Sequence, residues 1–471
     1  MYNVKSKKAV EFIDDEEILL TLEYAQENKD NKQLIKSIIE KASECKGLTH
    51  REASVLLACE DDALNEEVYT LAKKIKQRIY GNRIVFFAPL YLSNYCINSC
   101  VYCPYHVKNK NICRKKLTQE EVKAETIALQ DMGHKRLALE AGEDPVNNPL
   151  EYILECINTI YSIKHKNGAI RRVNVNIAAT TVENYKKLKD AGIGTYILFQ
   201  ETYNKKNYES LHPAGPKSDY AYHTEAMDRA MEAGIDDVGL GVLFGLGTYA
   251  YELCGLLMHA EHLEAVFGVG PHTVSVPRIC PADDIDVNDF SNALPDRIWR
   301  KIVAIIRVAL PYTGMIVSTR ESEENRRVAL ELGISQISGA SKTTVGGYAN
   351  PEDENNTAQF DRSDTRTLDE VTDWLIGMGY MPSFCTACYR EGRTGDRFMP
   401  LAKSGAIGNC CQPNAIMTLK EYLVDYASDK TRSDGEKLIE KELMNIPNEK
   451  VRQITIERLK KIENGERDFR F

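Results

Sequence analysis

Apolar and polar positions alternate along the middle of the chain in a pattern that predicts strands and helices in turn. Short runs rich in β-branched and aromatic residues occur at 84–93, 136–143, 171–178, 195–203, 237–246, 272–279, 315–321 and 336–342. Amphipathic stretches of helical length separate these runs, which is typical of βαβ units with a buried parallel sheet. Eight such strands in order favour an α/β fold with a complete (β/α)8 TIM-type barrel rather than an open doubly wound sheet.

The stretches between the strands also carry residues that begin and end helices. Residues 117–133 place Thr118 three positions before Glu121, which is the spacing of an N-terminal capping box, and they end at Gly133. The stretches 181–192 and 321–333 end at a glycine as well. These boundaries support the strand–helix alternation.

The regions on either side of the barrel depart from this alternation. Residues 1–80 consist of helix-like runs and predict an N-terminal helical extension. Residues 346–366 are polar and acidic and predict an exposed loop, which a helix follows at 367–379. A cysteine-containing stretch and two helix-like segments complete the chain. We therefore expect the barrel to occupy 81–349 and a metal-binding, helical C-terminal segment to occupy 350–471.

The composition excludes several classes of function. Of the 471 residues 43% are hydrophobic, and the net charge of -9 argues against binding to nucleic acid through bulk charge. No apolar run reaches the ~20 residues of a transmembrane helix, and the first residues lack the apolar core of a signal peptide. We expect a cytoplasmic protein with no nucleic-acid and no membrane partner.

The 13 cysteines are the compositional feature that points to chemistry. Disulfides are not expected in a cytosolic protein, so unevenly clustered cysteines indicate metal binding or redox chemistry. Four of them stand alone in apolar or helix-like surroundings and are expected to be buried packing residues, namely Cys45, Cys59, Cys156 and Cys254. Cys113 and Cys280 stay unassigned, and the other seven fall into two groups.

The first group is Cys96-x3-Cys100-x2-Cys103, directly after the first predicted strand, where the active site of a barrel enzyme lies. Three thiolates in one loop suit a single soft metal centre. A zinc site would need a fourth ligand, for which His106 is the candidate. On a 4Fe-4S cluster, three cysteines would leave one iron open to an outside ligand.

With Tyr102 before its third cysteine, this motif resembles the signature of the radical S-adenosylmethionine (SAM) enzymes. The resemblance implies a full or partial barrel, a 4Fe-4S cluster whose open iron binds SAM, and an external one-electron donor. A second similarity lies on the second strand, where Ala141-Gly142-Glu143 stands for the family's Gly-Gly-Glu and differs at the first position. The resemblance implies that Glu143 binds the ammonium group of the cofactor.

Two further residues resemble the family's cofactor site. Glu201 follows the fourth predicted strand, and Arg229 lies in the next helix. In the family, a pair placed in this way holds polar groups of SAM. An ordinary surface ion pair is the alternative interpretation.

The second group is Cys385-x2-Cys388, with Cys411 after 22 intervening residues. Such a pair fits an iron–sulfur cluster or a zinc hairpin. Cys410 is adjacent to Cys411 and would complete the four ligands of a structural zinc ribbon, so this alternative stays open.

Together the two groups make nearly the whole chain similar to the tyrosine lyases that mature FeFe-hydrogenases. Residues 199–203, 270–279 and 317–322 also look like this family. The resemblance implies cleavage of the Cα–Cβ bond of L-tyrosine to p-cresol and dehydroglycine. At a second 4Fe-4S cluster with an extra labile iron, the small fragment would then yield CO and cyanide. The resulting Fe(CO)2(CN) unit would supply the hydrogenase through other maturation proteins.

Candidates for binding tyrosine follow from strand geometry. A carboxylate suits the fork-shaped guanidinium of arginine, and Arg278 and Arg320 lie at the C-terminal ends of the sixth and seventh predicted strands. Both ends face the active side of a barrel. Ser322 and Ser341 are polar neighbours in the sequence pattern.

His272 begins the sixth predicted strand, at the opposite mouth of the barrel from Arg278. A histidine at a strand start is more often structural. The family resemblance implies instead that its imidazole holds the labile iron. The second cluster would then lie at the bottom mouth, and the barrel interior would connect the two clusters.

Two other functions compete with this hypothesis. A 2-iminoacetate synthase of thiamine biosynthesis shares the barrel and the tyrosine chemistry, but it lacks the second cysteine group. A non-catalytic iron–sulfur scaffold or carrier would hold clusters without cleaving SAM or tyrosine.

Overall fold

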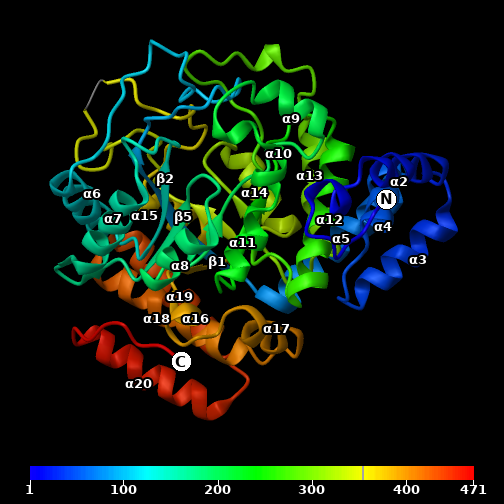
Figure 1. Ribbon diagram of the computed structural model, residues 1–471. Helices are drawn as coiled ribbons and strands as arrows, with labels where there is room; N and C mark the ends of the chain where they lie inside the picture. Colours follow the sequence, from blue (N-terminus) through cyan, green and yellow to red (C-terminus); the bar gives the residue numbers. More distant parts are fainter. Residues whose placement is uncertain (353–354) are drawn as a thin grey trace.

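Within the described residues, 1–352 and 355–471 of the computed structural model, eight parallel strands close into a barrel (Figure 1). The barrel strands are β1 (Arg83–Ser93), β2 (Arg136–Ala141), β5 (Arg172–Asn176), β6 (Tyr196–Ile197), β7 (Val238–Gly241), β8 (Thr273–Ser275), β9 (Gly314–Val317) and β10 (Gln336–Ser338). They pair in this order, and β10 pairs back with β1 through Val85 and Gln336. The predicted complete (β/α)8 barrel is therefore confirmed.

Helices cover the outside of the barrel. The main ones are α6 (Gln119–Asp131), α7 (Leu150–Ser162), α8 (Val182–Asp190), α11 (Ala226–Glu232), α12 (Tyr249–Phe267), α13 (Asp296–Ala309) and α14 (Glu323–Leu332). The capping box at the start of α6 is present, because the Thr118 side chain accepts from the Glu121 amide and Glu121 binds back to the Thr118 amide. Gly133, after α6, has φ +99°, a conformation that favours glycine.

The N-terminal residues form the predicted helical extension beside the barrel. Its helices are α1 (Ala9–Phe12), α2 (Asp15–Glu27), α3 (Lys32–Ser43), α4 (His50–Ala58) and α5 (Asp62–Tyr80). These helices, which are blue in Figure 1, pack on α12 and α13. The His50 ring ties the extension to α12, since its nitrogens lie 3.0 Å from Glu17 Oε1 and 2.8 Å from Glu261 Oε2.

The C-terminal segment crosses the lower end of the barrel in Figure 1, opposite the long loops at the top. It contains α15 (Leu368–Gly377), β11 (Met381–Ser383), α16 (Ala387–Arg390), α17 (Gly395–Lys403), α18 (Gly408–Asp425), α19 (Asp429–Leu443) and α20 (Glu449–Glu463). Strand β11 was not predicted. It pairs in parallel with the start of β1, Arg83 opposite Met381, so this segment adds a strand to the barrel sheet.

The segment 346–366 is a loop, as its polarity predicts, but it is exposed only in part. Asp353 and Glu354 of this segment lie outside the described residues. The Tyr348 hydroxyl is buried and donates to a backbone carbonyl of β1, and Asp364 is buried against Arg326. The Gln359 side chain accepts a hydrogen bond from the hydroxyl of Tyr91, also on β1, at 2.8 Å. Exposure was wrongly predicted for these residues because they contact barrel residues, whereas 349–352 and 355–356 are exposed as expected.

Smaller elements lie between the main strands and helices. Helix α9 (Lys205–Leu211), the 3-10 turn η1 (Pro216–Ser218) and helix α10 (Tyr220–Thr224) lie between β6 and α11. The short hairpin β3 (Lys164–His165) and β4 (Gly168–Ala169) was not predicted. A second 3-10 turn, η2 (Val287–Asp289), precedes α13.

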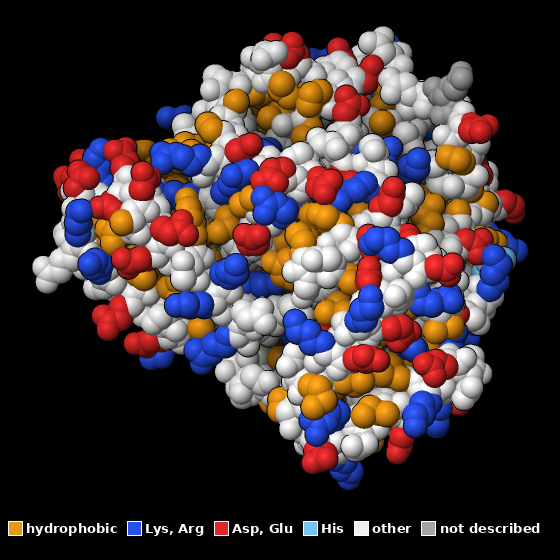
Figure 2. All heavy atoms as spheres, turned by 180° about the vertical axis from the view of Figure 1, so that it is seen from behind, with side chains coloured by type: hydrophobic (Ala, Val, Ile, Leu, Met, Phe, Trp, Pro, Cys, Tyr) orange, Lys and Arg blue, Asp and Glu red, His pale blue; other side chains and the backbone are white. Residues whose placement is uncertain are grey.

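On the face that Figure 2 shows, basic and acidic side chains are interspersed and hydrophobic areas lie between them. Among the helices in the described part of the chain, none is both long enough and apolar enough to cross a membrane.

Candidate functional site

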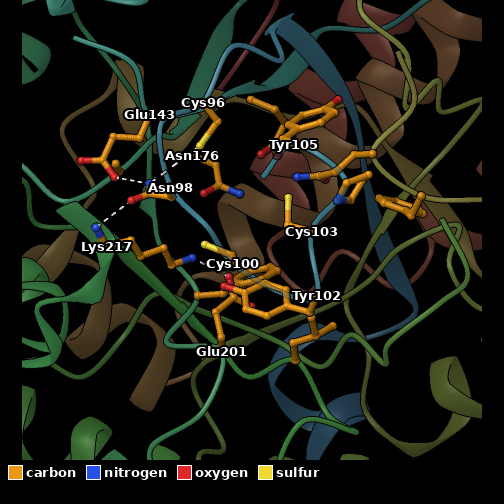
Figure 3. A pocket seen from close by; sticks show the side chains of 18 of the residues that line it. Cys96, Asn98, Cys100, Tyr102, Cys103, Tyr105, Glu143, Asn176, Glu201 and Lys217 are labelled. Carbon is orange, nitrogen blue, oxygen red and sulfur yellow. Dashed lines mark hydrogen bonds and ion pairs between the residues drawn. The ribbon is translucent and has the colours of Figure 1, made fainter. Parts of the chain in front are cut away.

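The loop with the first cysteine group lines a cavity at the upper end of the barrel. We call this the upper cavity, and Figure 3 shows the side chains of Cys96, Cys100 and Cys103 turned into it. Backbone hydrogen bonds fix the loop, because the amide of Ile97 donates to Glu143 O at 2.9 Å and that of Ser99 donates to Ala214 O at 2.9 Å. The three thiols therefore share one space although they lie in an irregular segment.

The environment of these thiols suits a metal centre. Burial raises the pKa of Cys100 to about 11. Burial, followed by repulsion from the other two thiols, raises the pKa of Cys103 further. Binding a soft metal would remove the protons. His106 is engaged elsewhere, since its Nε2 lies 3.1 Å from Asp284 Oδ2. Three thiols without this histidine fit the three-cysteine set of a 4Fe-4S cluster.

The residues after β2 form one wall of the upper cavity. Ala141, Gly142 and Glu143 all line it. A Cβ atom on Gly142 would lie 2.3 Å from the backbone oxygen of Tyr95, so a side chain at position 142 would collide with the cysteine loop. Glu143 accepts a hydrogen bond of 2.6 Å from Asn98 Nδ2, and burial raises the pKa of its carboxyl group.

Glu201 also faces the upper cavity, but its partner is not the residue that the sequence suggests. It has φ +67°, a strained conformation for a residue with a side chain, and its Oε1 lies 2.9 Å from Lys217 Nζ. Burial alone would lower the pKa of Lys217, but Glu201, Cys100 and Tyr208 together raise it. Arg229 instead donates from Nε to Thr180 O at 2.9 Å and covers the Tyr222 ring. The structure thus does not bring Glu201 and Arg229 together.

Tyr102 belongs to the cysteine loop and also lines the upper cavity (Figure 3). Its hydroxyl is 2.7 Å from His212 Nε2, and Lys217 Nζ lies 5.7 Å from its ring centroid. The ring therefore packs beside the Glu201–Lys217 pair. Lys217, on the turn η1, was missed because nothing in the sequence relates it to a residue 16 positions earlier.

A lower cavity continues from the upper one into the barrel interior. Both cavities are lined by Glu140, Asn176, Phe199, Pro277, Arg320, Gln359 and Phe360. The lower cavity then extends past Ser275 and Ser338 to Asn174 and Gln336. A TIM barrel normally fills this space with branched apolar side chains, and here small and polar residues take their place.

The four residues proposed for tyrosine separate into two pairs. Arg320 lines both cavities, with its guanidinium 3.6 Å from the Phe360 ring centroid. Ser341 lines the lower cavity, and its buried hydroxyl has no hydrogen-bond partner among the described residues. Arg278 and Ser322 line neither cavity.

Arg278 and Ser322 have other contacts that explain their positions. Arg278 donates to Glu321 Oε1 at 2.8 Å and to Asp296 Oδ1 at 2.7 Å, outside the barrel lumen. Ser322 is the exposed N-cap of α14, where it accepts from the Asn325 amide. The structure therefore places these two away from the cavity that was expected to bind the substrate.

The second cysteine group lies at the lower end of the barrel. Cys385 follows β11, Cys388 is in α16 and Cys411 is in α18. A hydrogen bond with Cys411 lowers the pKa of Cys388 to about 6, while burial raises that of Cys385. The three sulfur atoms interact although they come from three elements. Arg393 lies beside them and is also close to Cys410.

His272 faces the same end of the molecule. Its Nδ1 is 3.4 Å from Asp237 Oδ1, and burial lowers the pKa of the ring. Its ring centroid is 6.0 Å from that of Tyr389 in α16 and 5.9 Å from that of Phe398 in α17. The histidine at the start of the sixth predicted strand is therefore next to the segment that carries the second cysteine group.

The cysteines outside the two groups differ in their exposure. The four predicted packing cysteines, Cys45, Cys59, Cys156 and Cys254, are buried as expected. Cys280 lines the upper cavity, and Cys113 is exposed.

Comparisons with known proteins agree with this arrangement. Residues 90–253 match the Radical SAM superfamily, and residues 275–381 match the Biotin and Thiamin Synthesis associated domain. The 2-iminoacetate synthase of Salmonella typhimurium is 30% identical over 347 residues, which are 73% of this chain and 89% of that enzyme.

Two solved structures cover almost the whole chain. A crystal structure of HydG, a maturase of the FeFe-hydrogenase, is 57% identical, covers 98% of this chain and all of its own, and superposes with a TM-score of 0.94. The HydG of Carboxydothermus hydrogenoformans is 40% identical over 96% of this chain and 99% of its own, with a TM-score of 0.81. The chain belongs to the HydG family.

Membership of the HydG family makes this protein a radical SAM enzyme. The superfamily match includes the cysteine loop and the wall after β2, so a 4Fe-4S cluster and SAM are the cofactors that the family implies for the upper cavity. The matches to the two HydG structures extend over the C-terminal segment as well, beyond residue 381 where the second domain match ends.

Proposed function

We propose that this HydG-family protein cleaves the Cα–Cβ bond of L-tyrosine to p-cresol and dehydroglycine at the upper end of the barrel. At the lower end, the small fragment is converted to CO and cyanide on iron, which supplies an Fe(CO)2(CN) unit for FeFe-hydrogenase assembly. The observation that carries this proposal is the cavities in the barrel interior, because they lead from the first cysteine group toward the second.

In the upper cavity, each residue has a role that its position supports. Cys96, Cys100 and Cys103 would hold the cluster, which with SAM supplies the one-electron chemistry that starts the reaction. Glu143 would accept a hydrogen bond from the ammonium group of the cofactor, since its carboxylate already faces the cavity. Ala141 and Gly142 would leave room for the cofactor, with Tyr102 packed on the opposite side.

The tyrosine substrate would lie where the cavities join. Arg320 presents a guanidinium fork there, suited to the tyrosine carboxylate, and Ser341 offers a hydroxyl without a hydrogen-bond partner in the described part of the chain. Glu201 would act with Lys217 rather than with Arg229 on the polar groups of the cofactor.

At the lower end, Cys385, Cys388 and Cys411 would hold a second 4Fe-4S cluster, and His272 would bind the labile iron that becomes part of the product. A neutral imidazole is the form that binds iron, and burial favours it here by lowering the pKa of His272. The proposal also includes a cytoplasmic location, an external one-electron donor and other hydrogenase maturation proteins as partners.

The same chemistry could stop at dehydroglycine, as in 2-iminoacetate synthases. The C-terminal cysteines disfavour this alternative, since the match to the Salmonella enzyme leaves about a quarter of the chain unmatched. A non-catalytic iron–sulfur carrier would need no cavity between its two metal sites, and the cavity in the barrel interior therefore favours an enzyme.

The test is turnover of the anaerobically reconstituted protein with tyrosine, SAM and a reductant. We expect p-cresol together with infrared bands of iron-bound CO. Cys96→Ser should abolish both products, while Cys388→Ser should keep p-cresol and lose CO. CO bands of wild-type intensity in Cys388→Ser would contradict the role of the lower site, and lack of p-cresol in the wild type would contradict the lyase.

A further inference from the structure

One buried asparagine joins the separate parts of the upper cavity. Asn98 lies between Cys96 and Cys100 in the cysteine loop, lines the upper cavity and is only 2% exposed. Figure 3 shows its side chain next to Cys96 and turned toward Glu143. A buried amide needs hydrogen-bond partners, so the partners of Asn98 show what this residue does.

The oxygen of the Asn98 side chain fixes the cysteine loop to the turn η1. It accepts a hydrogen bond of 2.9 Å from the backbone amide of Lys217. A Cβ on Gly215 would lie 2.3 Å from this oxygen and 2.7 Å from the Cα of Asn98, so a glycine is needed where η1 approaches the loop. The Lys217 side chain in turn pairs with Glu201 at 2.9 Å. Asn98 therefore connects the cysteine loop to the Glu201–Lys217 pair.

The nitrogen of the same side chain has two acceptors. Asn98 Nδ2 donates to Glu143 Oε2 at 2.6 Å and to Cys96 Sγ at 3.7 Å. The backbone amide of Lys217 can only donate, which fixes the end of the Asn98 amide that carries the oxygen. Both N–H groups and the oxygen of the side chain are therefore engaged, each with a different part of the site.

The bond to Asn98 determines where the carboxylate of Glu143 lies. In the described part of the chain, Asn98 is the only group that donates a hydrogen bond to this carboxylate. The bond holds Oε2 at the cysteine loop, and Oε1 can accept from an ammonium group in the cavity. Without Asn98, the Glu143 side chain would lose the contact that orients it.

The bond to Cys96 reaches a residue that is proposed to hold the cluster. Hydrogen bonds to the sulfur atoms of an iron–sulfur cluster are among the features that set its reduction potential. An N–H group that donates to such a sulfur stabilises the added negative charge of the reduced cluster, so it raises the potential. The Asn98 amide has this effect without adding a charge of its own.

We propose that Asn98 is a positioning residue that links binding of SAM to reduction of the cluster at the first cysteine group. Its amide nitrogen holds Glu143 for the ammonium group of SAM and donates to the sulfur of Cys96, while its oxygen fixes the turn that carries Lys217. This inference rests on the proposed function, in which the cysteine loop holds the cluster and Glu143 binds the cofactor. One substitution at Asn98 should therefore change both the affinity for SAM and the reduction potential.

Binding of SAM without tyrosine tests the first of these effects. The anaerobically reconstituted protein is titrated with SAM, and binding is followed calorimetrically. We expect Asn98→Ala to weaken SAM binding about 10-fold, because Glu143 loses the charged hydrogen bond that orients it. Wild-type affinity for SAM in Asn98→Ala would overturn the proposal.

The reduction potential of the cluster tests the second effect. It is measured without SAM by a redox titration followed by EPR, in a Cys388→Ser background that removes the proposed second cluster. Asn98→Ala should shift the midpoint potential to more negative values, because the sulfur of Cys96 loses a hydrogen-bond donor. An unchanged potential would overturn the role of the bond to Cys96.

Asn94, at the start of the same loop, offers a matched control. It is buried, its Oδ1 accepts from the backbone amide of Lys115 at 2.7 Å, and its Nδ2 donates to the backbone oxygen of Cys113 at 2.7 Å. Its side chain thus makes similar bonds but does not line the upper cavity. Asn94→Ala should keep the wild-type affinity for SAM and the wild-type potential. Equal changes in Asn94→Ala and Asn98→Ala would overturn the proposal, since a loosened loop would explain both.

Turnover separates this inference from the proposed function. A wild type that binds SAM but forms no p-cresol would contradict the proposed function and leave both measurements on Asn98→Ala valid. If Asn98→Ala does not fold, a crystal structure of the reconstituted wild type with SAM decides. An Asn98 Nδ2 that donates to Glu143 and to the sulfur of Cys96 supports the proposal, and an amide turned away from both overturns it.

Discussion

Two carboxyl groups show how strongly the surroundings of one residue set its charge in this barrel. Glu140 points into the cavity between the two sites, and burial raises the pKa of its carboxyl group well above the usual value despite the nearby Arg320. Asp364 is buried too, but the guanidiniums of Arg366 and Arg326 lower its pKa to about 2. Neighbouring charge therefore decides between a neutral and an ionised carboxyl group at these two positions.

Replacing Glu140 by glutamine should stabilise the protein increasingly as the pH rises. A raised folded-state pKa means that folding favours the protonated form. The contribution of Glu140 to stability is therefore present below the unfolded pKa and is lost as the pH rises through the folded pKa. Glutamine has nearly the shape of a protonated glutamate but does not ionise. Urea unfolding of the apoprotein at pH 5 and pH 8 should show a larger gain at pH 8. The exposed Glu120→Gln is the control, and a pH-independent difference would contradict the expectation.

Replacing Asp364 by asparagine should have the opposite pH dependence. The substitution leaves the fully buried Arg326 without its counterion, which costs about 3–5 kcal/mol at neutral pH. Because the folded-state pKa of Asp364 is depressed, its contribution is present above the unfolded pKa and is lost as the pH falls toward 2. The difference from wild type in urea unfolding should therefore shrink between pH 7 and pH 3. Asp361→Asn, an exposed carboxylate nearby, should change little at either pH.

At the scale of elements, the local sequence pattern was enough to predict those strands and helices that their own residues determine. The eight barrel strands and α6 were predicted because apolar runs and the Thr118–Glu121 capping box are signals within one segment. Strand β11 was missed because it has three residues, one of them a proline, and exists through its pairing with β1.

The candidate sites follow the same rule. Cys96, Cys100 and Cys103 and the pair Cys385 and Cys388 could be found from their spacing, since neighbouring residues in one loop or turn share a ligand. Cys411, in the separate helix α18, was grouped with the pair through the family resemblance. The partners Lys217 and Gln359 could not be found, because the contacts that bring them to the upper cavity join different parts of the chain. Arg278 was placed correctly at its strand end, but Glu321 and Asp296 bind it outside the lumen.

Strand β11 and its neighbours hold the second cysteine group in place, which makes their packing testable. Phe384 precedes Cys385, is 3% exposed, and stacks on Phe86 and Tyr422 with centroids 5.3 and 4.8 Å away. Phe384→Ala should cost about 3–5 kcal/mol. We expect faster hydrogen exchange in α18 and new proteolytic cleavage near β11, while the N-terminal helices stay protected. Met444→Ala, on an exposed side chain, should change neither, and unchanged exchange in Phe384→Ala would show that β11 does not depend on this stack.

The whole molecule places its two cysteine groups at opposite ends of one barrel. The upper group depends on loops that follow the strands, and the lower group depends on a segment that joins the sheet beside β1. A reaction that begins at one end and finishes at the other needs an interior that is open and polar.

Blocking the interior should therefore separate the two halves of the proposed reaction. Ser275 lies on β8, lines the lower cavity and is absent from the lining of the upper one. Ser275→Leu should cost about 1–3 kcal/mol of stability and fill the passage, whereas Ser275→Ala leaves it open. With tyrosine and SAM, Ser275→Leu should form p-cresol near the wild-type rate but several-fold less CO per p-cresol, and Ser275→Ala should match the wild type in both. If the leucine variant kept the wild-type ratio of CO to p-cresol, the fragment would have to leave the upper cavity by another route, and the barrel interior would be only a packed core.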